Sequence, residues 1–279
     1  MHKLSSLIAA AAAAALSNTA QAADYDPPIV IEEAPNYVPV EIGSGWYLRG
    51  DIGYHIDTKP SGAFTYRTFD GVTYGNDAFD TARLSDEFTF GVGVGYSFTD
   101  LFRADVTLDR MSSSFSGAAL TAGPCPSGPA GTDCRSQNAS EFAGYSALLN
   151  GYVDLGTFVG FTPYVGAGAG FTYLSWDDVS SRSYCVDAGA PCGGVGLTDT
   201  ATHAGESDWR FTYALMAGVS YDLSQNMKVD LGYRYKRVRG GDMFAWDAAS
   251  AAAGATGVQG QDPGFSTHEV RLGLRLELW

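Results

Sequence analysis

Ser266 and His268 are the two residues of this chain that come closest in type and spacing to a nucleophile and its base. They are two positions apart at the start of a predicted strand, so both side chains lie on one face. A serine hydroxyl becomes nucleophilic when a histidine takes its proton and an acid orients that histidine. The neighbouring predicted strands present Tyr54, Tyr235 and Arg237 at this level, so we expect no orienting acid and interpret His268 as an interfacial histidine.

Four cysteines fall into two close pairs, Cys125 with Cys134 and Cys185 with Cys192. In an exported protein the surroundings are oxidising, so the spacing predicts two local disulfides, Cys125–Cys134 and Cys185–Cys192. A metal site is the alternative, but neither pair has the CxxC spacing that thiolate sites favour. We therefore expect no metal, and no motif in the sequence predicts a cofactor.

The first residues of the chain predict export. Lys3 precedes the apolar run 7–16, and Ala20–Ala22 has the small-x-small pattern that a signal peptidase cleaves, so residues 1–22 are interpreted as a signal peptide. The apolar run is too short to span a bilayer, which takes about 20 residues. Residues 23–43 combine prolines and acids and are predicted to form an extended periplasmic leader.

Charge and hydropathy narrow the class of protein. A formal net charge of −14 argues against nucleic acid as a partner. After residue 22 no stretch approaches 18 consecutive apolar residues, so no transmembrane helix is expected. Two classes remain, namely a soluble exported protein and a β-barrel that crosses a membrane with its strands.

Eight segments between residues 44 and 279 alternate apolar and polar residues with the period of two that is typical of a strand. They cover approximately residues 46–55, 87–97, 102–109, 141–155, 164–173, 210–222, 228–236 and 269–278. Short links near residues 99–100, 156–161 and 224–226 alternate with long links at 57–85, 112–139, 175–207 and 238–265. Outer-membrane barrels alternate short periplasmic turns and long extracellular loops in this way. The pattern predicts an all-β, eight-stranded antiparallel up-and-down transmembrane barrel.

Charged residues recur at alternate positions of these segments. A lipid-facing arginine or lysine near the bilayer midplane costs about 2–4 kcal/mol, so we expect the charges to point into the barrel. The predicted interior charge network consists of Arg49, Asp51, Glu87, Arg103, Asp105, Asp109, Asp154, Arg210, Asp222, Lys228, Asp230, Arg234, Lys236, Glu269, Arg271, Arg275 and Glu277.

An interior lined by these charges bears on permeation. Eight strands leave a lumen that side chains can fill, so we expect paired charges and no wide channel. Inward glycines in the strand segments would leave room for long arginine, lysine and tyrosine side chains. The alternative is a soluble β-sandwich whose charged face contacts water, but the sequence offers no second set of strands for it.

Aromatic residues cluster near the ends of the predicted strands. Tyrosine and tryptophan favour both membrane–water interfaces, where one edge of the ring is hydrated. The predicted aromatic girdle comprises Trp46, Tyr54, Tyr96, Phe102, Trp209, Tyr221 and Tyr235.

Four stretches carry a resemblance to a known family: FGVGVGYSF, PYVGAGAG, VDLGYRY and the terminal HEVRLGLRLELW. The chain resembles the small outer-membrane surface antigens of alphaproteobacteria, within the opacity-protein and OmpA-like barrels. The resemblance implies localisation in a Gram-negative outer membrane and a non-enzymatic role in envelope integrity and surface interaction. In this family the C-terminal strand ends in a lipid-facing aromatic residue, whereas here Leu278 has that register and Trp279 follows it.

Partners and alternatives follow from the same resemblance. We expect contact with outer-membrane lipid and lipopolysaccharide, recognition of the C-terminal strand by the barrel-assembly machinery, and a host or surface ligand at the extracellular loops. A narrow porin for small solutes is the first alternative function. The second is an enzyme similar to a lipid A deacylase, with Ser266 and His268 as its catalytic pair.

Overall fold

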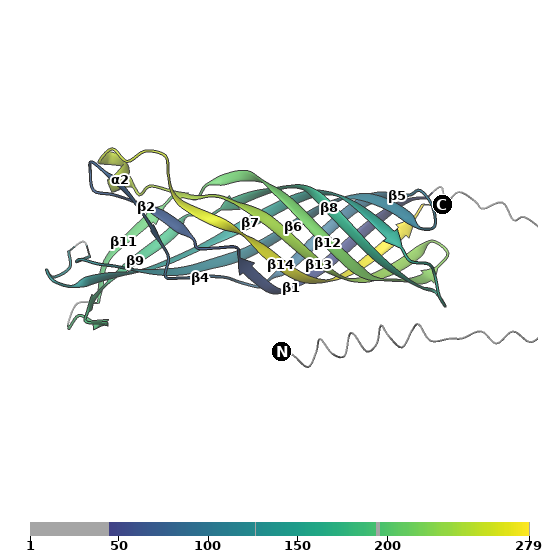
Figure 1. Cartoon of the computed structure of the whole chain (residues 1–279), viewed down its shortest axis with the longest axis horizontal. Helices are drawn as coiled ribbons and strands as arrows, with labels where there is room; N and C mark the ends of the chain where they lie inside the picture. The colour runs from purple at the N-terminus through teal and green to yellow at the C-terminus, as the bar shows by residue number, and fades with distance from the viewer. Residues whose placement is uncertain (1–44, 126, 194–195, 279) are drawn as a thin grey trace, which may run out of the picture. The chain divides into compact units, whose positions relative to one another are not determined.

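The computed structural model describes residues 45–125, 127–193 and 196–278 (Figure 1). The predicted signal peptide, residues 1–22, and leader, residues 23–43, lie outside the described residues, as does Trp279. The strands of the described part form one sheet of fourteen strands, accompanied by the short helix α2 (Ala248–Ala252). No helix in this part of the chain is long and apolar enough to cross a membrane.

Eight long strands form a closed antiparallel ring. Each is hydrogen-bonded on both sides, in the order β1–β5–β6–β7–β8–β12–β13–β14, and β14 pairs again with β1. The eight alternating segments of the sequence lie on these strands. Their bounds are β1 (Gly45–Pro60), β5 (Phe88–Ser97), β6 (Phe102–Thr121), β7 (Asp133–Asp154), β8 (Phe161–Trp176), β12 (Ser207–Ser224), β13 (Met227–Ala245) and β14 (Val258–Glu277).

The ring strands extend well beyond their predicted ends. β6 and β7 have 20 and 22 residues, whereas a membrane crossing takes about 9–11. The expected extents of the long loops 57–85, 112–139, 175–207 and 238–265 are therefore wrong, because strand pairing continues into polar sequence. Six short strands add to the sheet at this end: β2 (Thr65–Phe69), β3 (Tyr74–Ala78), β4 (Thr81–Leu84), β9 (Val179–Asp187), β10 (Ala190–Pro191) and β11 (Leu197–His203).

The opposite end of the ring carries the three short turns predicted from the sequence. Between β5 and β6, the Thr99 hydroxyl accepts hydrogen bonds from the backbone N–H groups of Leu101 and Phe102. Between β7 and β8, Gly156 and Gly160 have φ angles of 94° and 80°, a conformation that side chains with a Cβ disfavour. We call the part of the ring near these turns the turn half, and the part near β2, β9, β11 and α2 the hairpin half (Figure 1).

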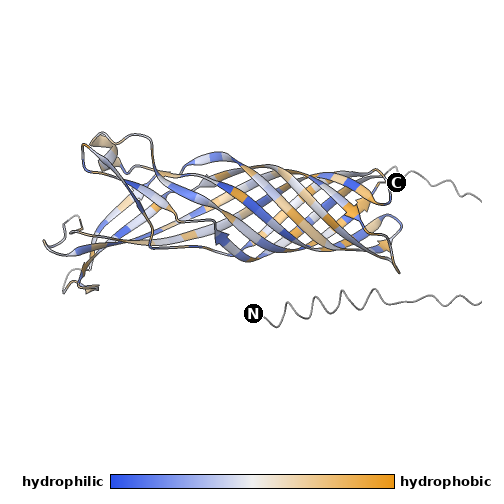
Figure 2. Ribbon diagram, in the orientation of Figure 1, coloured by the Kyte–Doolittle hydropathy of each residue, from blue (hydrophilic) through white to orange (hydrophobic). Residues whose placement is uncertain are grey.

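The two halves have opposite polarity. In the turn half the exposed face is apolar, and Figure 2 shows the hydrophobic positions concentrated there. Of the exposed large apolar side chains, all but Val72, Tyr74, Leu120 and Leu197 belong to the turn half or its turns. Beyond Leu108 the outward positions of β6 become polar, namely Arg110, Ser112, Ser114 and Ser116. The ring is thus apolar outside at one end and polar outside at the other.

The interior of the hairpin half is an aromatic core. Phe142 lies 4.5 Å from Trp176 and 5.5 Å from Phe265 between ring centroids, and Phe64 lies 4.8 Å from Phe115. These side chains are almost fully buried together with Met111, Leu174, Val238 and Met243. The core closes the ring on the hairpin side and stabilises this half as the core of a soluble protein would.

Inward glycines make room for large side chains in the turn half, as predicted. The Tyr47 ring lies against Gly95, and a Cβ added at Gly95 would overlap that ring. The Tyr47 hydroxyl donates a 3.0 Å hydrogen bond to Asp105. The absence of a side chain at Gly95 therefore lets the tyrosine reach the interior charges.

We predict that Gly95→Ala destabilises the folded protein by about 1–3 kcal/mol, because the methyl group overpacks against Tyr47. Gly50→Ala is the matched control: Gly50 faces outward with no atom within 4 Å of an added Cβ, so its effect should stay within about 0.5 kcal/mol. Urea unfolding in detergent micelles, followed on gels that separate folded from unfolded protein, measures both. Equal effects of the two variants would contradict the packing at Tyr47.

Candidate functional site

The predicted charge network lies on the inner face of the ring. Twelve of the seventeen residues are buried and the other five, Glu87, Asp154, Asp222, Lys228 and Glu277, are half-buried. The buried ones are Arg49, Asp51, Arg103, Asp105, Asp109, Arg210, Asp230, Arg234, Lys236, Glu269, Arg271 and Arg275. The strand alternation that makes the outer face apolar places these side chains inside.

Asp109 of β6 is the centre of the first ion-pair cluster. Its carboxylate accepts hydrogen bonds from Arg234 Nη1 at 2.8 Å and from Arg271 Nη2 at 2.7 Å. Arg234 also pairs with Glu269 at 2.7 Å. Because β6 and β13 are not neighbours in the ring, the Asp109–Arg234 pair crosses the interior. Charge-assisted, buried pairs of this kind fix the separation of the strands they join.

Arg49 of β1 organises a second cluster. Its guanidinium donates to Asp51 at 2.7 Å, to Asp105 at 2.9 Å and to the Tyr152 hydroxyl at 2.9 Å. Asn150 Nδ2 donates to the other oxygen of Asp105 at 2.7 Å. Every carboxylate in this cluster therefore has a donor, which is the condition for burying it at tolerable cost.

Toward the turns, Arg103 packs between two aromatic rings. Its guanidinium carbon lies 4.1 Å from the centroid of Tyr152 and 4.9 Å from that of Tyr164, and its Nε donates to Asp154 at 3.0 Å. Arg275 lies 3.6 Å from Asp230. At the rim of this end, Lys228 lies 3.2 Å from Asp222 and 3.4 Å from Glu277.

Arg210 and Lys236 mark the level at which the interior changes from charged to apolar. Arg210 donates to Asp262 at 2.6 Å and to Asp208 at 2.5 Å. The Lys236 ammonium lies 3.3 Å from the sulfur of Met111, at the base of the aromatic core. No carboxylate of the described residues lies within ion-pair distance of Lys236.

The clusters fill the interior of the turn half. A hollow between Arg49, Tyr152 and Arg234 has a volume of about 10 Å³, which is room for about one water molecule. The aromatic core continues the obstruction in the hairpin half. The arrangement is therefore suited to holding strands together rather than to passing hydrated solutes.

The predicted aromatic girdle lies on the outside of the ring. Trp46, Phe102 and Tyr221 are exposed near the turns, and Trp46 packs 5.3 Å from the half-buried Tyr96. At the other boundary of the apolar face the exposed or half-buried members are Tyr54, Trp209 and Tyr235. The residues therefore lie in two groups, one near each limit of the apolar outer face.

The surroundings of Ser266 and His268 differ from expectation in one respect. A β-bulge between His55 and Asp57 shifts the register of β1, so that Asp57 is opposite His268. The expectation that no acid lies on the outward face of a neighbouring strand is therefore wrong. It assumed unbroken alternation from Tyr54, and the bulge adds one residue to that alternation.

Asp57 nevertheless does not complete a proton relay in this structure. Its carboxylate binds Lys59 Nζ at 2.5 Å, and His268 Nδ1 shares a hydrogen bond with the Tyr233 hydroxyl. Among the described residues no hydrogen bond joins Ser266 to His268. Asp57 and His268 are therefore each bound to another partner, and neither is positioned to activate Ser266.

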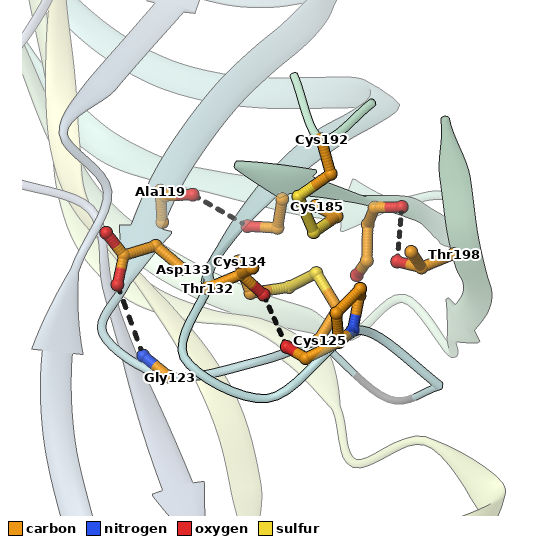
Figure 3. Close-up of a disulfide and its surroundings, with 12 residues drawn as sticks. Ala119, Gly123, Cys125, Thr132, Asp133, Cys134, Cys185, Cys192 and Thr198 are labelled. Carbon is orange, nitrogen blue, oxygen red and sulfur yellow. Dashed lines mark hydrogen bonds between the residues drawn. A yellow bond between two sulfur atoms is a disulfide. The ribbon is translucent and has the colours of Figure 1, made fainter. Parts of the chain in front are cut away.

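The two predicted disulfides, Cys125–Cys134 and Cys185–Cys192, are confirmed (Figure 3). Cys134 on β7 and Cys185 on β9 are register partners, so the two bridges are adjacent at the end of the hairpin half. In the described part of the chain, no group of three or more His, Cys, Asp or Glu residues is arranged to hold a metal ion.

The aromatic core is the feature that reasoning from sequence missed. Met111, Phe115 and Ala119 alternate with serine and alanine along β6, but in the phase opposite to Val106 and Leu108. That change of phase within one uninterrupted strand is the signal in the sequence. It is weak because the serines between these residues are also typical of a loop.

We predict that Arg234→Met destabilises the protein by about 3–5 kcal/mol, because it leaves buried carboxylates short of a partner. Arg239→Met, on the same strand but exposed, should change stability by no more than about 0.5 kcal/mol. Unfolding in urea, measured as for the glycine variants, gives both values. A neutral Arg234→Met would show that the cross-ring pair contributes little.

Comparison with known proteins agrees with this geometry. The profile of the family described as "Outer membrane protein beta-barrel domain" matches residues 7–275. A protein of Brucella suis named only as uncharacterized is 37% identical over 280 residues, 93% of each chain. A putative adhesin of Rickettsia conorii is 28% identical over 233 residues, 82% of this chain and 83% of its own.

Among solved structures, the outer membrane protein OprG of Pseudomonas aeruginosa aligns with a TM-score of 0.43 and 12% identity, over 85% of this chain and 96% of its own. The family match spans nearly all of the strands described above. The chain therefore belongs to the outer membrane protein β-barrel domain family and is a protein of the outer membrane.

Proposed function

We propose that the eight-stranded ring is a transmembrane barrel that maintains envelope integrity and presents its hairpin half at the cell surface for contact. The turn half would cross the outer membrane, with the short turns in the periplasm. Residues 1–22 would be removed as a signal peptide, and residues 23–43 would remain as a periplasmic leader.

The opposite polarity of the two halves is the observation that carries this proposal. Apolar outward side chains such as Leu108, Leu215 and Leu272 are exposed by about half of their area, which is favourable in lipid and unfavourable in water. The outward polar side chains at positions 110–116 of β6 are favourable in water and unfavourable in lipid. A boundary between lipid and water at Arg110 satisfies both requirements.

Contact with lipopolysaccharide is supported by a surface hollow at this boundary. This hollow has a volume of about 400 Å³ and is lined largely by apolar residues, including Phe90, Leu108 and Trp209. Arg110 also lines it. Arg110 is exposed and has no ion-pair partner among the described residues. An acyl chain in the hollow would place an anionic headgroup within reach of this guanidinium.

The remaining partners rest on strand β14 and on the hairpin half. Val270, Leu272, Leu274 and Leu276 form the exposed apolar face of β14, and we propose that the assembly machinery recognises this segment. The Rickettsia relative is named a putative adhesin, and this supports a role for the hairpin half in surface contact. The filled interior disfavours a porin. The hydrogen bond of His268 to Tyr233 in place of Ser266 disfavours a lipid A deacylase.

The membrane orientation is testable by labelling. Val72, in the β2–β3 turn, is 85% exposed, and Asn226 lies in the short β12–β13 turn. Val72→Cys should react with a membrane-impermeant maleimide on intact cells, whereas Asn226→Cys should react only after the outer membrane is permeabilised. The native cysteines are disulfide-bonded, so labelling of the unsubstituted protein gives the background signal. The reverse pattern would overturn the orientation.

The filled interior predicts the absence of stable channels. Purified protein in planar lipid bilayers should give no reproducible conductance steps, because paired charges and the aromatic core obstruct the lumen. A general porin reconstituted in the same way is the positive control. Reproducible steps whose size changes in an Asp105→Ala variant would establish permeation through the barrel and favour the porin alternative.

A further inference from the structure

The hairpin half contains a hollow of about 470 Å³ above the aromatic core. Its walls come from β2, β7, β9, β11, β13 and β14 and from the connection between β6 and β7. This volume is within the range of about 300–1,000 Å³ that is usual for small-molecule sites. The hollow is separate from the charged interior, which lies on the other side of the core.

One wall of the hollow is a set of uncharged hydrogen-bonding groups. Ser136 and Asn138 on β7 are register partners of Ser183 and Ser181 on β9, and all four line the hollow. Directly opposed residues of an antiparallel pair point to the same face. Three hydroxyls and one amide therefore face the hollow in two neighbouring rows, with both donor and acceptor capacity.

A second part of the lining is aromatic. Tyr66 and Phe79 lie 5.1 Å apart between ring centroids, and the His203 ring lies 5.2 Å from Phe244. Burial lowers the pKa of His203, so its imidazole is neutral at neutral pH. Gln259 adds a second amide on this side. The lining therefore combines flat apolar faces with the hydroxyl wall.

Among the described residues, the lining of the hollow contains no Asp, Glu, Lys or Arg, in a chain that has 48 such residues. The lining therefore offers no cationic side chain to pair with an anionic ligand and no carboxylate to pair with a cationic ligand. Ser136 Oγ donates a hydrogen bond to the Ala119 carbonyl, and Asn138 Nδ2 donates one to Ser136 Oγ. A purely apolar ligand would cover the remaining polar groups of this wall, including the Ser181 and Ser183 hydroxyls, without giving them partners, which is costly. A ligand with hydroxyl groups on its edge and an apolar face fits both walls.

The disulfides hold the polar wall in place. Cys134 itself lines the hollow, and the Cys125–Cys134 bridge closes the connection between β6 and β7. On the neighbouring strand, Cys185–Cys192 closes the β9–β10 hairpin, so both strands of the wall carry a disulfide at the same end (Figure 3). A wall that is rigid before binding loses less entropy when a ligand binds.

We propose that this hollow binds a neutral saccharide, of the size of a mono- or disaccharide unit at the end of a glycan. Sugar hydroxyls would bond to Ser136, Asn138, Ser181 and Ser183, and the C–H face of the ring would pack on Tyr66 and Phe244. The proposal rests on the proposed function, because the hollow meets external glycans only if the hairpin half is extracellular.

The test uses the full-length mature protein in an amine-oxide detergent, whose headgroup contains no sugar that could compete. Maltose, lactose, cellobiose and N,N′-diacetylchitobiose are titrated as probes, with binding followed by saturation-transfer NMR and calorimetry. Saturable binding of at least one of these sugars is expected. No saturable binding of any of the four would overturn the proposal.

Two variants on one strand locate the site. Ser181→Phe places a ring in the hollow and should abolish binding. Ser180→Phe adds the same ring to the exposed face of β9 and should leave binding unchanged. Should Ser181→Phe fail to fold, judged by its mobility on unheated gels, Asn138→Ala replaces it and should weaken binding about tenfold or more.

Two further outcomes count against the proposal. Binding that Ser181→Phe or Asn138→Ala leaves intact would place the saccharide elsewhere, and Ser181-dependent binding of decanoate in place of the sugars would identify an apolar site. Failure here is distinguishable from failure of the proposed function. Labelling of Val72→Cys and Asn226→Cys tests the orientation without any ligand.

Discussion

The pair between Asp109 and Arg234 joins two strands that have no backbone contact with each other. Hydrogen bonds between neighbours fix the order of the ring, and the strand number and register set its diameter. Side chains must fill the interior that results, and in the turn half many of them are charged. Each carboxylate must find a donor there, because an unpaired buried charge costs several kcal/mol. The closed, filled interior follows from this requirement.

A single strand such as β6 serves two environments. Up to Leu108 its even-numbered side chains face outward and are apolar, and from Arg110 onward the outward side chains are mainly polar. Inside, the order is reversed, from Asp105 and Asp109 to Met111 and Phe115. The hairpin half therefore has the polar outside of a soluble β-structure, and it is continuous with a half whose outside is apolar. In the hairpin half the apolar core is inside, because the outward side chains there are too polar to form one.

Two successive obstructions, paired charges and then packed aromatics, separate the two ends of the ring. A protein built in this way exposes its specific chemistry at surfaces, and the hairpin half is where disulfides, aromatic walls and uncharged polar groups meet. Cys134 and Cys185 strengthen the two strands that carry Ser136 and Ser183. The rigidity of this end suits recognition of a small external group better than it suits adaptation to many partners.

The sequence by itself determined where the central parts of the eight ring strands lie, which face carries their charged residues, and how the cysteines pair. These depend on local rules: a side chain changes face at every residue, and Cys125 is near Cys134 in any hairpin. Only the tertiary structure decided that Asp109 meets Arg234, which is 125 residues away. It also decided that a bulge turns Asp57 toward His268, and that the polar stretches continue as strands around Phe115 and Phe142. Pairing between distant strands depends on register, bulges and closure of the ring, and alternation within one strand carries no information about them.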